Sequence, residues 1–290
     1  MSAAVEIVAA PPREAPWIAR LLRAPGGAIG AALILLLLFS ALFGDALVPY
    51  SPTRMAAGRP LLAPSLAHLF GTDEFGRDEF SRVLAGARHT LMVGLVAVGL
   101  SFSAGLIVAM LAVLARGWRG AAVMRLMDVL FSFTDTLIAL ACVAVLGASL
   151  QNAVLAVGIA AIPFYARTAH AAALVERGKP YCEAAAVAGA GPLRLALRHL
   201  LPNIMPVMIV VATMGVSTAI LATAALSFLG LGAQPPMPEW GLMLAGARSY
   251  MERAPWLMLF PGLAIALTVL GFNLLGDALR DAIDPGRRGR

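Results

Sequence analysis

Residues 91–115 read LMVGLVAVGLSFSAGLIVAMLAVLA and contain no charged side chain. The run is longer than the roughly 20 helical residues that cross a hydrocarbon layer of about 30 Å. Because lipid offers no water to backbone N–H and C=O groups, we expect a helix here. Similar apolar runs lie on both sides of it. Together they predict six membrane-spanning helices, near residues 27–48, 90–115, 127–147, 152–170, 203–228 and 255–278.

The composition of the whole chain is also typical of a membrane protein. Of its 290 residues, 60% are hydrophobic and only 13% are charged, and the mean hydropathy is +0.84. A soluble domain usually has charges on about 25% of its residues. So few charges could not cover a water-exposed surface, which excludes disordered chains, disulfide-stapled scaffolds and ordinary cytosolic enzymes.

One apolar stretch holds two of the predicted helices. Residues 136–166 carry no charge, and this stretch is too long for a single span of about 20 residues. Glycine and polar residues at positions 147–152 predict a tight hairpin that divides it.

The basic residues predict the orientation of the chain. With the amino terminus inside, roughly two-thirds of the 22 Lys and Arg residues fall on the inner side, as in membrane proteins generally. Because they form short clusters between apolar runs, the net charge of +6 does not indicate a nucleic-acid partner. The predicted segments are an inner tail (1–26), a first span (27–48), an outer loop (49–89), a five-span core (90–280) and an inner tail (281–290).

Motifs for independent catalysis were not found in the sequence. A phosphate-cradling loop needs a Gly-Lys-Ser or Gly-Lys-Thr step, and the single lysine, Lys179, is followed by Pro180. The four histidines lack metal-ligand spacing, and no G-x-S-x-G elbow is present. We therefore predict a chain that binds no cofactor or metal, and an intramembrane protease stays open only as a minor alternative.

Three polar residues fall within the predicted spans. Asp128 and Asp135 lie seven residues apart on the third span, a spacing that predicts one shared helix face. Intramembrane polar groups are costly and usually functional. We interpret Asp128, Asp135 and Asn273 as residues of the pathway or of the bundle. The alternative is an ion-coupled transporter that uses Asp135, which would lose all uptake on Asp135→Asn.

The inner loop at 171–202 has the pattern of two short helices. Pro180 suits the first position of a helix, and Ala184 and Ala185 favour helix formation. Gly189 permits an abrupt end, after which Pro192 begins a second, amphipathic segment. The pattern predicts a compact projection that could receive force from a soluble partner, and a solvated linker is the alternative.

This loop also resembles the EAA motif of ABC-importer permeases. The matching residues are Glu183-Ala184-Ala185, Gly189 and Leu201-Pro202, and His199 stands where the family usually has an apolar residue.

Other segments resemble the dipeptide, oligopeptide and nickel branch of that family, specifically its second, shorter permease subunit. These segments are Gly71-Thr72-Asp73, Gly76-Arg77-Asp78, Ser81-Arg82, Ser227-Phe228-Leu229-Gly230-Leu231-Gly232, Gln234-Pro235-Pro236, Pro238-Glu239-Trp240-Gly241, Phe272-Asn273-Leu274-Leu275-Gly276-Asp277, Leu279-Arg280-Asp281 and Asp284-Pro285.

The resemblance implies an all-α permease with the type I importer fold in a bacterial inner membrane. It further implies a heterodimer with a second permease, one or two ATPase subunits that bind ATP and Mg²⁺, and an extracytoplasmic solute-binding protein. Residues 183–189 would be the helix that couples to the ATPase. Phe75, Phe80 and Trp240 are candidate contacts for the binding protein, or else pack against the bundle. Dipeptides or oligopeptides are the expected solutes, with nickel, glutathione or opines as alternatives.

Overall fold

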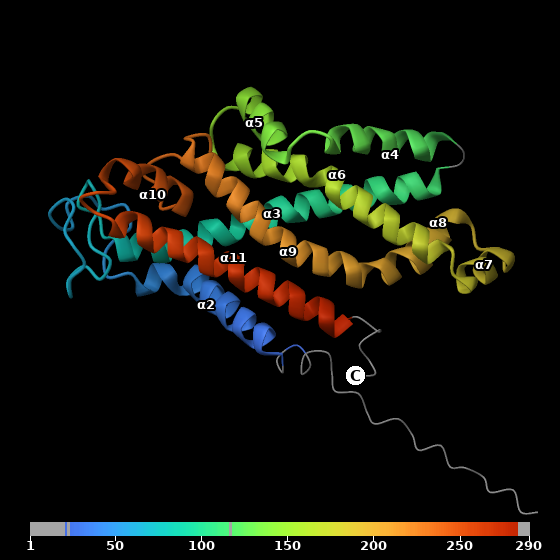
Figure 1. Cartoon of the computed structure of the whole chain (residues 1–290), viewed down its shortest axis with the longest axis horizontal. Coiled ribbons are helices and arrows are strands. Elements are labelled where there is room, and N and C mark those ends of the chain that lie inside the picture. The colour runs from blue at the N-terminus through green and yellow to red at the C-terminus, as the bar shows by residue number, and fades with distance from the viewer. Residues whose placement is uncertain (1–20, 22–23, 116–117, 284–290) are drawn as a thin grey trace, which may run out of the picture.

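The computed structural model describes residues 21, 24–115 and 118–283. Most of the two predicted tails, and the Asp284-Pro285 pair, lie outside these residues. The described chain is an elongated helical bundle (Figure 1). Its helices are α2 (Pro25–Leu47), α3 (Glu79–Leu114), α4 (Trp118–Phe131), α5 (Asp135–Leu146), α6 (Leu150–Arg177), α7 (Pro180–Val187), α8 (Pro192–Leu195), α9 (Leu201–Phe228), α10 (Trp240–Ala247) and α11 (Trp256–Ile283).

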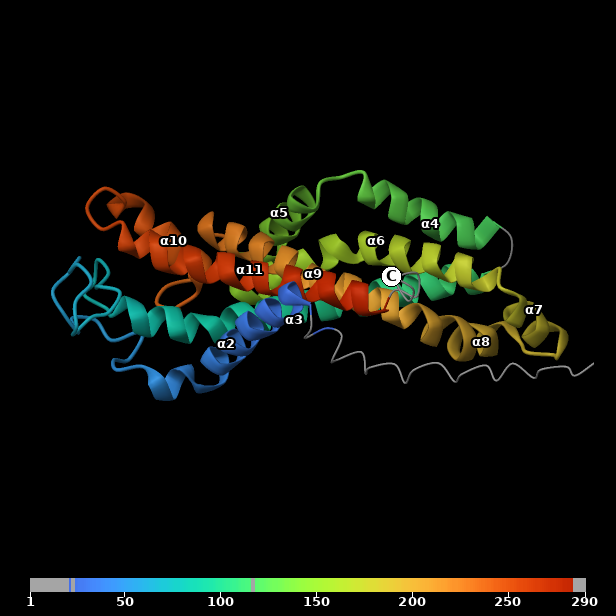
Figure 2. The same cartoon turned by 60° about the horizontal axis from the view of Figure 1, so that its bottom comes forward.

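Helix α3 lies at the centre of the bundle and packs most extensively on α6. Small residues allow the two backbones to approach closely, as is common between membrane helices. A Cβ at Gly105 of α3 would lie 2.6 Å from the Cβ of Tyr165. On the same interface, Ala109 and Ala166 are fully buried. Helix α2 packs on α3 and α11, on the side opposite α4 and α5 (Figure 2).

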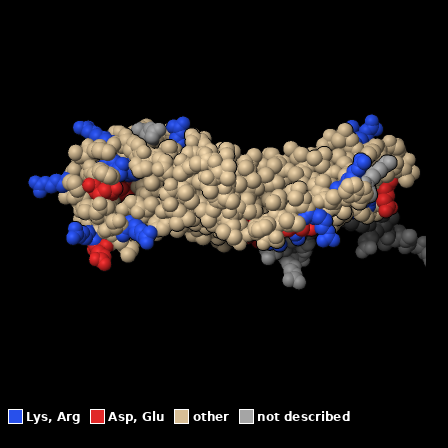
Figure 3. Space-filling view, turned by 90° about the horizontal axis from the view of Figure 1, so that it is seen from above, with Lys and Arg blue, Asp and Glu red and all other residues tan. Residues whose placement is uncertain are grey.

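Most charged side chains lie towards the two ends of the molecule. Figure 3 shows Lys, Arg, Asp and Glu at both ends and a wide uncharged belt between them. Leu35, Leu42 and Val145 are 64%, 74% and 87% exposed, which suits contact with lipid rather than water. Among the described residues, five helices are long and apolar enough to cross a membrane, and α4 with α5 gives a sixth span if the two are taken together.

The third span differs from the prediction of one helix over 127–147. Helix α4 ends at Phe131, α5 begins at Asp135, and the two are bent by 88°. The Ser132 hydroxyl donates to the carbonyl of Val129 at 2.6 Å, a local bond of the kind that competes with helix continuation. Because Asp128 and Asp135 lie on different helices, the prediction that they share one helix face was wrong.

Two helix boundaries also differ from the prediction. Helix α3 begins at Glu79 instead of near residue 90, because the Asp78 side chain caps it by accepting from the backbone N–H of Ser81 at 2.9 Å. Helix α6 continues to Arg177 instead of ending near residue 170. The predicted hairpin is confirmed, with Ser149 accepting from the backbone N–H of Asn152 at the start of α6.

Candidate functional site

Helix α7 projects from one end of the bundle (Figure 1), and a polar cluster anchors it. Glu176, near the end of α6, accepts a hydrogen bond from the Tyr181 hydroxyl at 2.6 Å and forms an ion pair with Lys179 at 2.7 Å. The Asn203 amide of α9 donates to the same tyrosine oxygen at 3.2 Å. Through Tyr181, α7 is therefore held to both α6 and α9.

The end of α7 is fixed by a glycine. Gly189 has φ +85°, a conformation that costs other residues energy because of their Cβ. The N–H of Ala190 donates to the carbonyl of Ala185, and the N–H of Gly189 donates to that of Ala186, both at 3.0 Å. This Schellman pair ends the helix sharply. The short helix and glycine turn predicted from the sequence are confirmed.

The outward face of α7 is open. Glu183, Ala184 and Val187 are exposed, with Val187 at 90%, whereas Cys182 is buried against the bundle. After the turn, the chain passes through α8 and one π-helical turn, Ala196–Leu200, into α9. There Leu201 is half-buried and Pro202 is exposed at the start of α9. A fixed helix with uncovered apolar residues is more typical of a docking element than of a linker.

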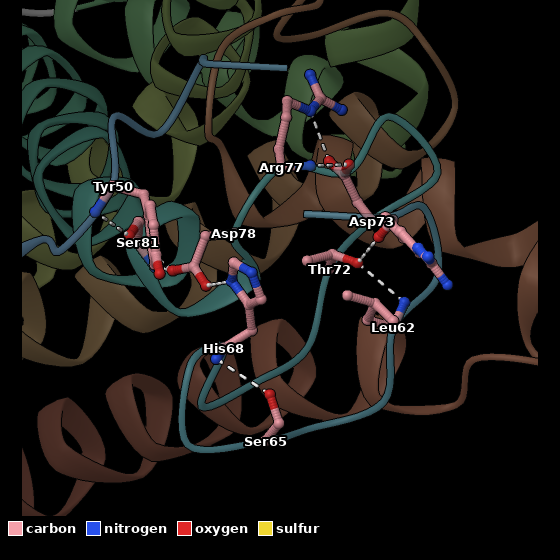
Figure 4. A network of polar contacts seen from close by, with 10 residues as sticks. Tyr50, Leu62, Ser65, His68, Thr72, Asp73, Arg77, Asp78 and Ser81 are labelled. Atoms are coloured by element: carbon pink, nitrogen blue, oxygen red, sulfur yellow. Dashed lines mark hydrogen bonds and ion pairs between the residues drawn. The ribbon is translucent and has the colours of Figure 1, made fainter. Parts of the chain in front are cut away.

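At the opposite end, Asp73 organises the outer loop (Figure 4). Its carboxylate accepts from the backbone N–H groups of Phe75 and Arg77, each at 2.9 Å, and from the Arg77 side chain at 2.5 Å. Arg82 of α3 lies 3.6 Å from the same carboxylate. The turn reverses at Gly76, with φ +69°. These contacts explain the Gly-Thr-Asp and Gly-Arg-Asp segments as the framework of a rigid outer cap.

A second buried contact joins this cap to α3. Asp78 accepts from the Ser81 hydroxyl at 2.7 Å and lies 2.8 Å from His68 Nδ1. Arg82 donates to the backbone carbonyl of Pro52 at 3.1 Å. Because all these side chains are buried, the loop and the outer end of α3 form one unit.

Of the three candidate contacts for a binding protein, only Phe75 presents an open ring, at 49% exposure. Phe80 is half-buried and packs edge-on against Phe70 at 5.0 Å. Trp240 is 3% exposed and donates to the carbonyl of Val83 at 2.9 Å, so it packs against the bundle. The sequence missed α10, which begins at Trp240 and is capped by Glu239 through the backbone N–H groups of Gly241 and Leu242.

The polar residues within the spans have different environments. Asp128 forms an ion pair with Arg167 of α6 at 2.6 Å. This pair was not predicted from the sequence. The available signal was that Arg167 is the first charged residue after the uncharged run 136–166. Asn273 accepts from the Ser217 hydroxyl at 2.7 Å and so joins α11 to α9. Asp135 lines a cavity of about 250 Å³ among α3, α5, α6 and α9. Within the described residues, no cluster of His, Cys, Asp and Glu could hold a metal ion.

A bundle of apolar helices with charged ends and an anchored projecting helix defines a membrane-embedded protein. The sequence identifies the family of this membrane protein. Residues 101–289 match the family of binding-protein-dependent transport system inner membrane components. The chain belongs to this family and is a multi-pass inner-membrane permease subunit. The predicted transport class is thereby confirmed.

Curated relatives match nearly the whole chain. The di/tripeptide transport system permease protein DppC of Pseudomonas aeruginosa is 47% identical, over 89% of this chain and 88% of its own. The dipeptide permease DppC of Escherichia coli K12 is 44% identical, over 91% and 90%. The glutathione transport system permease protein GsiD of another Escherichia coli strain is 45% identical, over 89% and 86%.

A solved structure confirms the fold. The chain matches a chain of the inward-facing MetNI methionine ABC transporter with a TM-score of 0.59 and 21% identity, over 70% of this chain and 97% of that chain. The predicted type I importer permease fold is therefore confirmed.

Proposed function

We propose that this chain is one of two different permease subunits of an ATP-driven importer of dipeptides and short oligopeptides. An extracytoplasmic binding protein would deliver the peptide, and one or two ATPase subunits would bind ATP and Mg²⁺ beneath the membrane. The observation that carries the proposal is the similarity, over about 90% of the chain, to permeases named for dipeptides and tripeptides.

The anchored helix α7 supports the coupling role. Glu183, Ala184, Ala185 and Gly189 would sit in a groove of the ATPase, with Leu201 and Pro202 continuing the motif into α9. When the ATPases close around ATP, α7 would move as a rigid piece, because Tyr181 links it to Glu176 of α6 and Asn203 of α9. The motion would thereby reach two membrane helices together, as a rigid-body switch requires.

A reconstituted complex tests this role directly. The chain is purified in mild detergent with its co-encoded permease, ATPases and binding protein, and ATP-dependent uptake of labelled L-alanyl-L-alanine into proteoliposomes is measured. Glu183→Lys should insert and fold normally, yet lose ATPase association and uptake. Uptake that continues without ATP, or normal ATPase association in Glu183→Lys, would contradict the proposal.

Glutathione is the second candidate solute, because one relative at 45% identity is named for it. Competition separates the candidates, with unlabelled peptide, glutathione and Ni²⁺ each added at the same excess over labelled peptide. We expect dipeptides to compete at the lowest concentration. Stronger competition by glutathione or Ni²⁺ would reassign the solute while leaving the permease role unchanged.

At the outer end, Phe75 is the residue that we propose for contact with the binding protein. Its exposed ring lies below the Arg77 guanidinium, whose Cζ is 4.7 Å from the ring centroid. Because Asp73 fixes Arg77 in place, the ring is presented on a rigid support. Phe80 and Trp240 would act indirectly, by holding the cap against the bundle.

A further inference from the structure

The break between α4 and α5 places a carboxylate in an unusual position. Asp135 begins α5, is exposed, and forms no hydrogen bond or ion pair with any described residue. Figure 1 places the break about midway between the outer loops and α7. Irregular backbone and a carboxylate are tolerated at such depth only where protein or a water-filled cavity covers them. This face of the bundle is therefore expected to be covered by water or by another protein rather than by lipid.

The cavity beside Asp135 has a volume of about 250 Å³. Small residues make room for it, because Ala139 of α5, Ala160 of α6 and Ala222 of α9 lie on its walls. Among the described residues that line it, Asp135 is the single charged one. An apolar cavity with one uncompensated carboxylate is complementary to a small cation with apolar parts.

A second polar group in this cavity lacks a partner. Tyr165 of α6 lines it and is 2% exposed, and its buried hydroxyl forms no hydrogen bond with any described residue. The hydroxyl lies against Gly215 of α9, where no Cβ could fit. Burying an unpaired hydroxyl costs about 1–3 kcal/mol. A polar atom that enters when α6 and α9 separate would therefore bind this group favourably.

We propose that this cavity is a transit subsite for the free amino terminus of the peptide. Asp135 binds the ammonium group, the Tyr165 hydroxyl donates to the first peptide carbonyl, and the alanine-rich walls accept a small side chain. The inference rests on the proposed function, and it adds that the permease itself recognises the charge of the amino terminus.

Protection of a cysteine from alkylation measures occupancy without depending on transport. In the purified complex, Cys142 and Cys182 are replaced by alanine, and Thr218, an exposed residue that lines the cavity on α9, is replaced by cysteine. We expect millimolar L-alanyl-L-alanine to slow maleimide labelling at least fivefold. N-acetyl-L-alanyl-L-alanine, which lacks the ammonium group, should not slow it. Ser132→Cys, at the break but outside the cavity lining, should be labelled equally with either peptide.

Two substitutions of Asp135 complete the test. Asp135→Asn should abolish protection by the free peptide and lower uptake five- to tenfold, and Asp135→Glu should keep most of both. Assembly of each variant with its partners is checked by gel filtration. Equal protection by the two peptides, or protection that survives Asp135→Asn, would overturn the subsite. So would a complex that imports peptide but shows no protection, whereas a complex without any import would count against the proposed function.

Discussion

At the scale of single residues, two tyrosine hydroxyls have opposite surroundings. The Tyr165 hydroxyl is buried without a partner, whereas the Tyr181 hydroxyl binds Glu176 and Asn203. Tyr165→Phe should therefore stabilise the resting protein by about 1 kcal/mol, because it removes an unpaired polar atom. Tyr181→Phe should destabilise it by a similar amount. Thermal unfolding of both variants in the same detergent measures the difference, and an equal change in both would contradict this account.

The buried carboxylate of Asp73 should contribute more to the stability of the outer loop than the partly exposed carboxylate of Glu74. Asp73→Asn removes the carboxylate that both buried guanidinium groups share and leaves Arg77 with Glu74 at 3.8 Å, which should cost about 3 kcal/mol. Glu74→Gln is the control, because Glu74 lies 3.8 Å from Arg77 and is partly exposed. Its pair should contribute about 1 kcal/mol or less. Faster proteolysis of the outer loop in Asp73→Asn alone is the expected result.

The polar residues within the spans could be predicted from the sequence, but their partners could not. Asp128, Asp135 and Asn273 stand out because they interrupt apolar runs. Their partners do not, since Arg167 and Ser217 come from helices far away in the chain. For Trp240 the sequence left open a contact with the binding protein or packing against the bundle, because its burial depends on how the preceding loop folds back onto α3.

At the scale of elements, two neighbouring glycines near α7 provide a matched comparison. Both have open space where a Cβ would lie, but Gly189 has φ +85° and Gly191 has φ −65°. Gly189→Ala should cost about 1–2 kcal/mol of local stability and loosen the end of α7. Gly191→Ala should be neutral. We expect ATP hydrolysis per peptide imported to rise in Gly189→Ala only, and a rise in both variants would exclude backbone conformation as the cause.

Helices were predictable where local signals marked their ends. Pro180 and Gly189 bracket α7, and Ser149 marks the start of α6. The break before Asp135 has only Ser132, Phe133 and Thr134 as local signals, and similar residues occur inside unbroken spans. Beyond the 88° bend, α5 packs on α6, a contact that a single stretch of sequence does not encode.

At the scale of the whole molecule, the two charged ends should face opposite compartments. After Cys142 and Cys182 are replaced by alanine, Thr53→Cys in the exposed outer loop should react with a membrane-impermeant maleimide added to intact spheroplasts. Val187→Cys, 90% exposed on α7, should react only after the membrane is opened. The reverse pattern would mean that the arginine distribution had been misread.

The overall plan of the molecule was the most predictable level. Span number, hairpin and bundle class follow from apolar length and from the need to satisfy backbone groups in lipid. The cavity beside Asp135 was not predictable, because it forms where α5, bent away from α4, packs on α6 but leaves a gap beside α9.

The broken third span also has a consequence for biosynthesis. Helix α4 has 14 residues and α5 has 12, which makes them about 21 Å and 18 Å long. Neither can cross a hydrocarbon layer of about 30 Å alone. We therefore expect the third span to insert stably only once α6, which packs on both helices, has been made.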